Sequence, residues 1–239
     1  MKLDTKRTVL VGFAFLSICA FWQMYDNLVP LILTNTFHLN ETISGAIMAA
    51  DNVMALFLLP LFGGLSDKCT SRLGRRRPFI LFGTLAAICL MLLLPLFADS
   101  YHAAPGGGKI ALFICVLGLL LVAMGTYRSP AVALMPDITP KPLRSKANAI
   151  INLMGALGGI IYLIITTFLY KTTADVYVSY LPLFAIVGGI MLAALAVILL
   201  CVDEPKLVAE QRRYEDAHPE DNLTQVTENG ETLPKDVKK

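Results

Sequence analysis

Charged side chains are scarce in this chain of 239 residues. Asp, Glu, Lys and Arg together make up 16% of the sequence, against about 25% in a typical soluble domain. Hydrophobic residues make up 56%, and the mean hydropathy is +0.64. The net charge of +2 comes from clustered cations rather than from a basic face on a soluble domain, which excludes a nucleic-acid-binding protein. The composition therefore predicts a membrane protein.

The residues that build metal sites and catalytic centres are few and dispersed. None of the five cysteines has a metal-ligand or CxxC spacing, so we expect them to pack as small apolar side chains. The three histidines lie outside the apolar stretches, and no carboxylate–His or Ser–Lys pair occurs at membrane depth. There is no Walker sequence for a nucleotide. We therefore expect no metal, no bound cofactor and no enzyme activity.

Long apolar stretches are what the sequence has in abundance. A spanning helix needs about 20 mainly apolar residues, because each adds 1.5 Å against a hydrocarbon core about 30 Å thick. Backbone amides cannot stay unpaired in lipid, so each stretch must be helical. The sequence thus predicts an all-α membrane protein with six transmembrane helices, at about 8–34, 42–65, 78–98, 110–134, 146–170 and 180–202.

The chain changes character after the sixth stretch. Residues 1–202 are predicted to form the six-helix transmembrane bundle. Residues 203–239 are polar and mixed in charge, which is typical of a disordered, linker-like segment. Within it, 207–217 could form a short surface helix.

Cations are distributed unequally between the two sides of the predicted bundle. One side has eleven: Lys2, Lys6, Arg7, Lys68, Arg72, Arg75, Arg76, Arg77, Lys141, Arg144 and Lys146. The other side has two, Lys109 and Lys171. The positive-inside rule then predicts a multi-pass protein of the cell membrane with both termini in the cytoplasm.

A charged turn, GGLSDKCTSRLGRRRPFI at 63–80, separates the second and third stretches. Asp67 lies where the second helix leaves the membrane and can accept charge-assisted hydrogen bonds from the arginines of the turn. Gly74 permits a tight reversal, and Pro78 is favoured at the start of the third helix. These features predict a compact cytoplasmic turn whose cations help to hold the topology.

The same turn resembles the G-x-x-x-D-x(n)-R-x-G-R-[RK] signature of major facilitator transporters. The motif residues here are Gly64, Asp67, Arg72, Gly74, Arg75 and Arg76. The longer form S-D-x-C-x-S-R-x-G-R-R-R-P-F-I is similar to the plant sucrose–proton symporters and to the glycoside–pentoside–hexuronide:cation symporters. A second stretch, PAVALMPDITPKPLRSKANAIINLMGALGG at 130–159, resembles the segment between helices four and five of the same group.

This resemblance implies a fold and a partner. Such transporters have twelve spans in two six-helix halves, each a 3+3 inverted repeat, around a central cavity. We therefore interpret the chain as the N-terminal half of a major facilitator fold, completed by a second half in a longer parent, in a separate chain or in a homodimer. The resemblance also implies that the turn biases the outward-facing state, although a topology signal alone would explain the cations. Asp137 matches the aspartate of the second segment, or else it pairs with Arg144 or with the turn.

Polar side chains inside the spans are candidates for function, because an acid at bilayer depth costs roughly 2.5–3.5 kcal/mol on insertion scales. Asp26 and Asp51 lie about equally far from the turn between the first two helices, so they share a depth in the outer half of the membrane. Asn27 and Asn52 follow them directly. Arg128 lies in the inner half of the fourth helix.

We predict roles for these residues in binding sugar and protons. Asp26 would bind a sugar hydroxyl or a proton, Arg128 would balance the buried negative charge, and Asp51 is the alternative proton site. Gln23 and Tyr25 could contact the sugar, whereas packing is the favoured role for Trp22. The last candidate in the fifth helix, Asn152, could line the cavity or join helices.

Two departures from the resembled family bear on the coupling ion and the substrate. Sodium-using members have two carboxylates one turn apart before the proline of helix two, where this chain has Ala55 and Leu59. Protons are therefore favoured over sodium. The plant carriers have an arginine late in helix five that this chain lacks, which leaves sucrose itself open.

The resulting prediction is proton-coupled symport of a sugar or glycoside by alternating access, performed by this half together with a second. The alternatives are a sensor or assembly subunit that retains the half-fold without transport, and an inactive truncated fragment. A lipid bilayer and a small sugar are the other expected partners.

Overall fold

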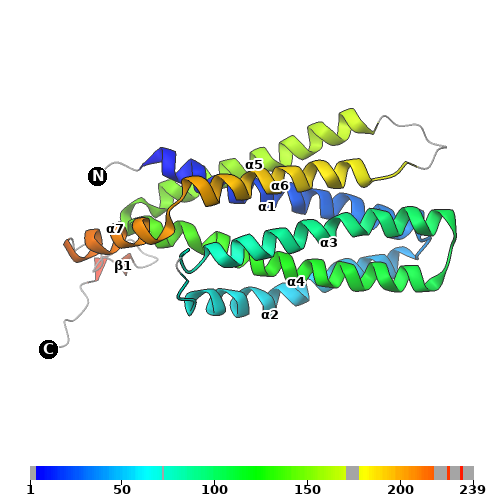
Figure 1. The fold of residues 1–239 in the computed structure, drawn as a ribbon, viewed down its shortest axis with the longest axis horizontal. Coiled ribbons are helices and arrows are strands. Elements are labelled where there is room, and N and C mark those ends of the chain that lie inside the picture. Colours follow the sequence, from blue (N-terminus) through cyan, green and yellow to red (C-terminus); the bar gives the residue numbers. More distant parts are fainter. Residues whose placement is uncertain (1–3, 72, 171–177, 218–224, 227–231, 234–239) are drawn as a thin grey trace.

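The structure is a computed structural model that describes residues 4–71, 73–170, 178–217, 225–226 and 232–233. Long helices dominate it (Figure 1). In chain order the elements are α1 (Thr5–Leu31), η1 (Ile32–Thr36), α2 (Glu41–Asp67), α3 (Arg77–Ala103), α4 (Gly107–Ile138), η2 (Lys141–Leu143), α5 (Arg144–Leu169), α6 (Leu181–Cys201), α7 (Glu204–Ala217), β1 (Gln225–Val226) and β2 (Thr232–Leu233). The two short strands pair antiparallel, with Gln225 opposite Leu233.

Six helical segments of the described chain are long and apolar enough to cross a membrane, and they coincide with the six predicted stretches. The first consists of α1 and η1, a π-helical continuation after Pro30. Several helices extend past the predicted bounds, because their polar ends continue the helix beyond the hydrocarbon. The predicted all-α fold with six spans is thus confirmed.

The packing of the helices shows the internal repeat. The most extensive contacts are α1 with α5, α3 with α4, α1 with α6, α2 with α4, and α3 with α6. The pairs are related by a simple exchange of α1 with α4, α2 with α5, and α3 with α6. Under this exchange each contacting pair becomes another pair of the same set, and α3 with α6 becomes itself. The bundle is therefore built from two equivalent three-helix units, as the 3+3 repeat requires.

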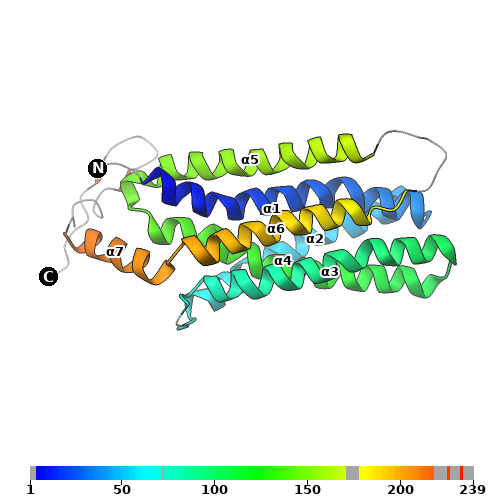
Figure 2. The same cartoon turned by 45° about the horizontal axis from the view of Figure 1, so that its top comes forward.

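One end of the bundle holds most of the described charge. Figures 1 and 2 both place the N-terminus, the α2–α3 connector and α7 at this end. We call it the charged end and define it by residues 63–71, 73–77 and 136–144 and by α7.

Residues 203–239, predicted as a disordered, linker-like segment with a possible short surface helix, begin with the helix α7. Two contacts hold it to the bundle: Arg7 Nη1 lies 2.9 Å from Glu210 Oε2, and Glu204 is 1% exposed beneath the α2–α3 connector. The helix starts earlier than the predicted 207–217. The rest of that expectation, at 218–224, 227–231 and 234–239, lies outside the described residues.

Glycines allow α1 and α5 to approach closely. A Cβ atom on Gly158 of α5 would lie 2.1 Å from the backbone oxygen of Leu16, and one on Gly155 would lie 2.9 Å from Cys19 Sγ. Small residues that let backbones meet are a typical means of helix association in membranes. This contact fixes α5 against the helix that carries Asp26.

The substitution Gly158→Ala is expected to destabilise the bundle by about 1–3 kcal/mol, because the Leu16 carbonyl cannot move away without shifting α1. The matched control is Gly189→Ala in α6, where no atom lies within 4 Å of the added Cβ. Thermal unfolding of the detergent-solubilised variants measures both. Equal stability of the two variants would contradict the close α1–α5 contact.

Candidate functional site

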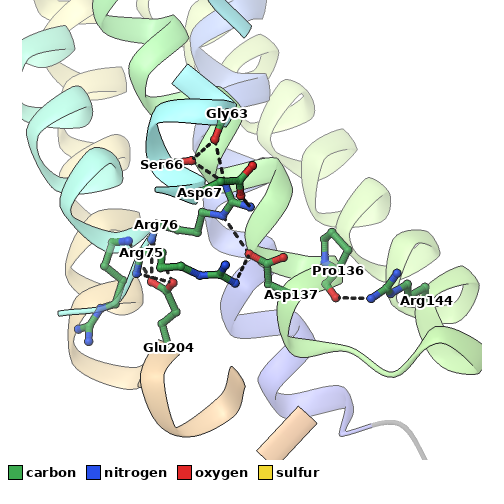
Figure 3. Close-up of polar contacts among 10 residues, drawn as sticks. Gly63, Ser66, Asp67, Arg75, Arg76, Pro136, Asp137, Arg144 and Glu204 are labelled. Atoms are coloured by element: carbon green, nitrogen blue, oxygen red, sulfur yellow. Dashed lines mark hydrogen bonds and ion pairs between the residues drawn. The ribbon is translucent and has the colours of Figure 1, made fainter. Parts of the chain in front are cut away.

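The guanidinium group of Arg76 is the centre of a polar cluster at the charged end (Figure 3). The Arg76 side chain is 6% exposed; its Nη2 lies 2.5 Å from Asp67 Oδ1 and its Nε 2.9 Å from Asp137 Oδ2. Its Nη1 donates to Ser66 Oγ at 2.5 Å and to the Gly63 carbonyl at 3.3 Å. One side chain therefore joins the ends of α2, α3 and α4.

An arginine suits this position because its planar fork presents several donors in fixed directions. The carbonyls at helix C-termini lack intrahelical donors, and α2 and α4 both end here. A second cation, Arg75 Nη2, lies 3.9 Å from Asp137 Oδ2. The contact predicted between Asp67 and the arginines of the turn is present, and it involves Arg76.

Glu204 closes the cluster from α7. Its carboxylate accepts hydrogen bonds from the backbone N–H groups of Arg75, Arg76 and Arg77 at 2.8–3.1 Å. These are the donors at the start of α3, where a negative charge also interacts favourably with the helix dipole. Gly74, with φ of +112°, packs directly on this carboxylate, since a Cβ there would lie 2.3 Å from Glu204 Oε2.

Two further arginines cap helix ends. Arg77 Nη2 donates to the Leu199 carbonyl of α6. Arg144 donates to the carbonyls of Pro136 at 2.8 Å and Thr139 at 3.1 Å, at the end of α4. Of the alternatives for Asp137, the structure thus shows pairing with the turn rather than with Arg144.

A second polar group lies deeper, around Trp22. The Arg128 guanidinium carbon lies 5.3 Å from the centre of the Trp22 ring, in a cation–π contact between α4 and α1. Trp22 also packs edge-on against Tyr25, with ring centroids 5.3 Å apart. Arg128 forms no ion pair with any acid of the described chain, so its predicted balancing of a carboxylate is not a direct contact here.

A small cavity joins Arg128 to α2. It has a volume of about 20 Å³ and is lined by Trp22, Arg128 and Asp51 together with apolar side chains. Asp51 is half-buried, and its Oδ1 has no hydrogen-bond partner in the described chain. Asn52, the next residue, is exposed.

The outer part of α1 carries an exposed polar face. Gln23, Asp26 and Asn27 are all exposed, and their spacing of i, i+3 and i+4 places them on one side of the helix. The Asn27 amide donates to the Gln23 carbonyl at 2.6 Å. The carboxylates of Asp26 and Asp51 lie close enough to interact electrostatically.

Comparison with known proteins identifies the family. The sequence profile of the Major Facilitator Superfamily matches residues 11–232. The chain belongs to this superfamily. The family points to a transporter, and with six apolar helices this chain is a multi-pass membrane protein.

Relatives of this major facilitator protein include named sugar carriers. It is 32% identical to "Sucrose transport protein SUC3" of Arabidopsis thaliana over 56% of this chain and 24% of the relative. It is 28% identical to "Sucrose transport protein SUT4" of Oryza sativa subsp. indica over 66% of this chain and 28% of the relative. It is 33% identical to the human "Proton-associated sugar transporter A" over 45% of this chain and 15% of the relative. The chain thus aligns with about a quarter of the length of the sucrose transport proteins.

The major facilitator fold brings some predicted site residues together and leaves others apart. Tyr25 is 1% exposed and points into the bundle, away from the polar face of α1. Asn152 is exposed on α5, but it lies at a different depth from the polar face of α1. Gln23 of that face packs at Gly159 of α5. Asn152 precedes Gly159 by seven residues and so lies about 10 Å nearer the charged end than Gln23 does. At the charged end, Gly64 lies in the last turns of α2, and Arg72 lies outside the described residues.

Glu204 is the functional candidate that the sequence did not reveal. It lies in a segment whose composition is that of a solvated linker, and neither quoted motif includes it. The available signal was its place immediately before Pro205, since acids and proline are both typical of the first turn of a helix.

Proposed function

We propose that this chain forms the N-terminal half of a proton-coupled sugar transporter that works by alternating access. The observation that carries the proposal is the exposed face of Gln23, Asp26 and Asn27 on α1, within a membrane span that is otherwise mainly apolar. Exposed polar groups at membrane depth require a water-filled cavity or a partner. The printed names of the relatives supply the substrate class, a sugar.

The chemistry of this face suits a polyol. A carboxylate accepts hydrogen bonds from two neighbouring hydroxyl groups, and the amides of Gln23 and Asn27 offer both donors and acceptors. A ligand pocket usually measures about 300–1,000 Å³, whereas the cavity beside Trp22 measures about 20 Å³. A sugar therefore binds against the open face of α1 rather than in the cavity beside Trp22.

A second six-helix half would enclose that face. α2 and α5 are the least buried of the spans, and their outward surfaces are apolar. On α2, Val53, Leu56 and Phe57 are 61–70% exposed; on α5, Leu153 is 63% and Phe168 77% exposed. A second half packed on both helices would leave the polar face of α1 lining a central cavity. It could be covalently linked, a separate chain or a second copy.

The coupling ion in this proposal is the proton. Ala55 and Leu59, which stand where sodium-using transporters have carboxylates, line the small cavity as apolar side chains. They offer no oxygen ligands of the kind that hard cations require.

The Arg76 cluster has a conformational role in this scheme, because it joins α2 and α3 of one repeat to α4 of the other. We place this end of the protein, with both termini, in the cytoplasm of a cell whose plasma membrane holds the transporter.

Reconstitution tests the proposal. A photo-crosslinker at Phe57 first identifies the second half by mass spectrometry, with Phe82 on α3 as the control position expected to capture lipid only. Proteoliposomes containing both halves should then show alkalinisation of the outside medium when a transported disaccharide or glucoside is added. Sugar binding without proton movement would favour the sensor alternative, and neither binding nor movement with both halves present would refute the proposal.

A further inference from the structure

Two residues that line the same small cavity each have a buried polar atom without a partner in the described chain, and the two atoms are of opposite kind. Asp51 Oδ1 is an acceptor and Trp22 Nε1 is a donor, and both lack a hydrogen-bond partner in the described chain. Both residues line the cavity of about 20 Å³, as does Arg128. A buried polar group without a hydrogen bond is destabilising, so two around one cavity require an explanation.

The cavity has the size and chemistry for a single water molecule. A buried water needs at least about 10–15 Å³ and between two and four polar partners. Here it would receive a hydrogen bond from the indole N–H, donate one to Asp51, and have the Arg128 guanidinium beside it. A bare metal cation fits poorly, because two of the three polar groups are donors.

We propose that this cavity binds one water molecule bridging Asp51 to Trp22, and that Asp51 is the residue that binds and releases the coupled proton. The inference rests on the proposed function for its role in transport. The proposal gives the two acids different roles. Asp51 lines the cavity that holds the water, whereas Asp26 does not line it and remains exposed on the open face of α1 for the sugar.

Other ionisable side chains near Asp51 could also change charge with pH, and the experiment must distinguish them from Asp51. From α1, Tyr25 and Asp26 interact with it electrostatically. From α4, Arg128 lines the same cavity. η1, which also packs against α2, has no titratable side chain. Asp26 is therefore the acid that must be distinguished from Asp51.

Trp22 is the only tryptophan of the chain, so its fluorescence reports on this cavity. Excitation moves electron density from the pyrrole to the benzene ring of indole, so a negative charge near Nε1 lowers the energy of emission. Acidification that protonates Asp51 should therefore shift the emission of the purified chain in lipid nanodiscs to shorter wavelength. Asp51→Asn should emit at the shorter wavelength at every pH, whereas Asp26→Asn should keep the pH response.

A cavity-filling variant tests the water itself. Ala55 lines the cavity, so Ala55→Val should displace the water, shift the emission to shorter wavelength and reduce the pH response with Asp51 still present. Ala50→Val, at an exposed position of the same helix, is the matched control and should behave as the wild type.

Three results would overturn the proposal: a pH response that survives Asp51→Asn, a wild-type response in Ala55→Val, or a sodium-dependent shift at constant pH. Because the measurement needs neither sugar nor a second half, its failure is distinguishable from a failure to transport. In the transport assay, Asp51→Asn should retain sugar exchange and lose proton-driven accumulation.

Discussion

Replacement of Asp26 by asparagine is expected to lower the initial rate of proton-driven sugar uptake by about 5- to 75-fold at sugar concentrations near the wild-type KM. Asparagine keeps the shape of the side chain but replaces a charged acceptor by a neutral one on the exposed face of α1. A hydrogen bond to a charged group contributes about 1.5–3 kcal/mol, which corresponds to about 10- to 150-fold in affinity. KM should rise by about that factor, measured as initial uptake of labelled sugar into proteoliposomes containing both halves under an imposed proton gradient.

The matched control is Asp203→Asn. Asp203 lies outside the spans and pairs with Lys206 at 2.8 Å on the surface, where solvent screens the interaction. Uptake by this variant should equal that of the wild type. High sugar concentrations should partly restore uptake by Asp26→Asn, because its defect is in binding. An unchanged KM in Asp26→Asn would remove this residue from the sugar site.

The depth of these residues in the membrane could be predicted from the sequence, but the direction of their side chains could not. Counting residues from the turn places Asp26 and Asp51 at one depth, since an α-helix rises 1.5 Å per residue. The rotation of α1 about its own axis, which decides the direction in which each side chain points, could not be predicted in this way. α1 is apolar on nearly all sides, so its pattern has no stripe that tells the core face from the cavity face. The sequence therefore predicts that Tyr25 lines the sugar site beside Asp26, although the structure buries the Tyr25 side chain.

The sequence predicts which charged residues take part in the ion pairs of the turn, but it does not predict which arginine pairs with which acid. Five cations and one aspartate in a single turn make some pairing certain, and the sequence offered Asp67 and Asp137 as acceptors. Which arginine is enclosed depends on how α2, α3 and α4 converge, a long-range property. Glu204 shows the same limit more strongly, because its partners are backbone N–H groups 127–129 residues earlier in the chain.

Replacement of Arg76 by methionine is expected to destabilise the protein more than any other change at the charged end. The buried guanidinium makes contacts of 2.5–3.3 Å to four residues, and methionine can replace its volume but none of its donors. Removing one partner of a buried ion pair costs about 3–5 kcal/mol. Asp67 is 55% exposed and can be hydrated, so we expect about 2–3 kcal/mol, or about 5–10 °C in Tm for a chain of this size.

Two comparisons decide whether this loss comes from the cluster rather than from the missing charge. Arg213→Met removes an arginine exposed on α7 and should leave the Tm, measured as the midpoint for loss of monodisperse protein on heating, within about 2 °C of wild type. A double-mutant cycle with Asp137→Asn should give a coupling energy above about 1 kcal/mol, since the two side chains meet at 2.9 Å. Additive effects of the two substitutions would mean that Arg76 stabilises the bundle through its other contacts. The joining of the two repeats at this end would then depend on other contacts, such as that of Arg75 Nη2 with Asp137 Oδ2 at 3.9 Å.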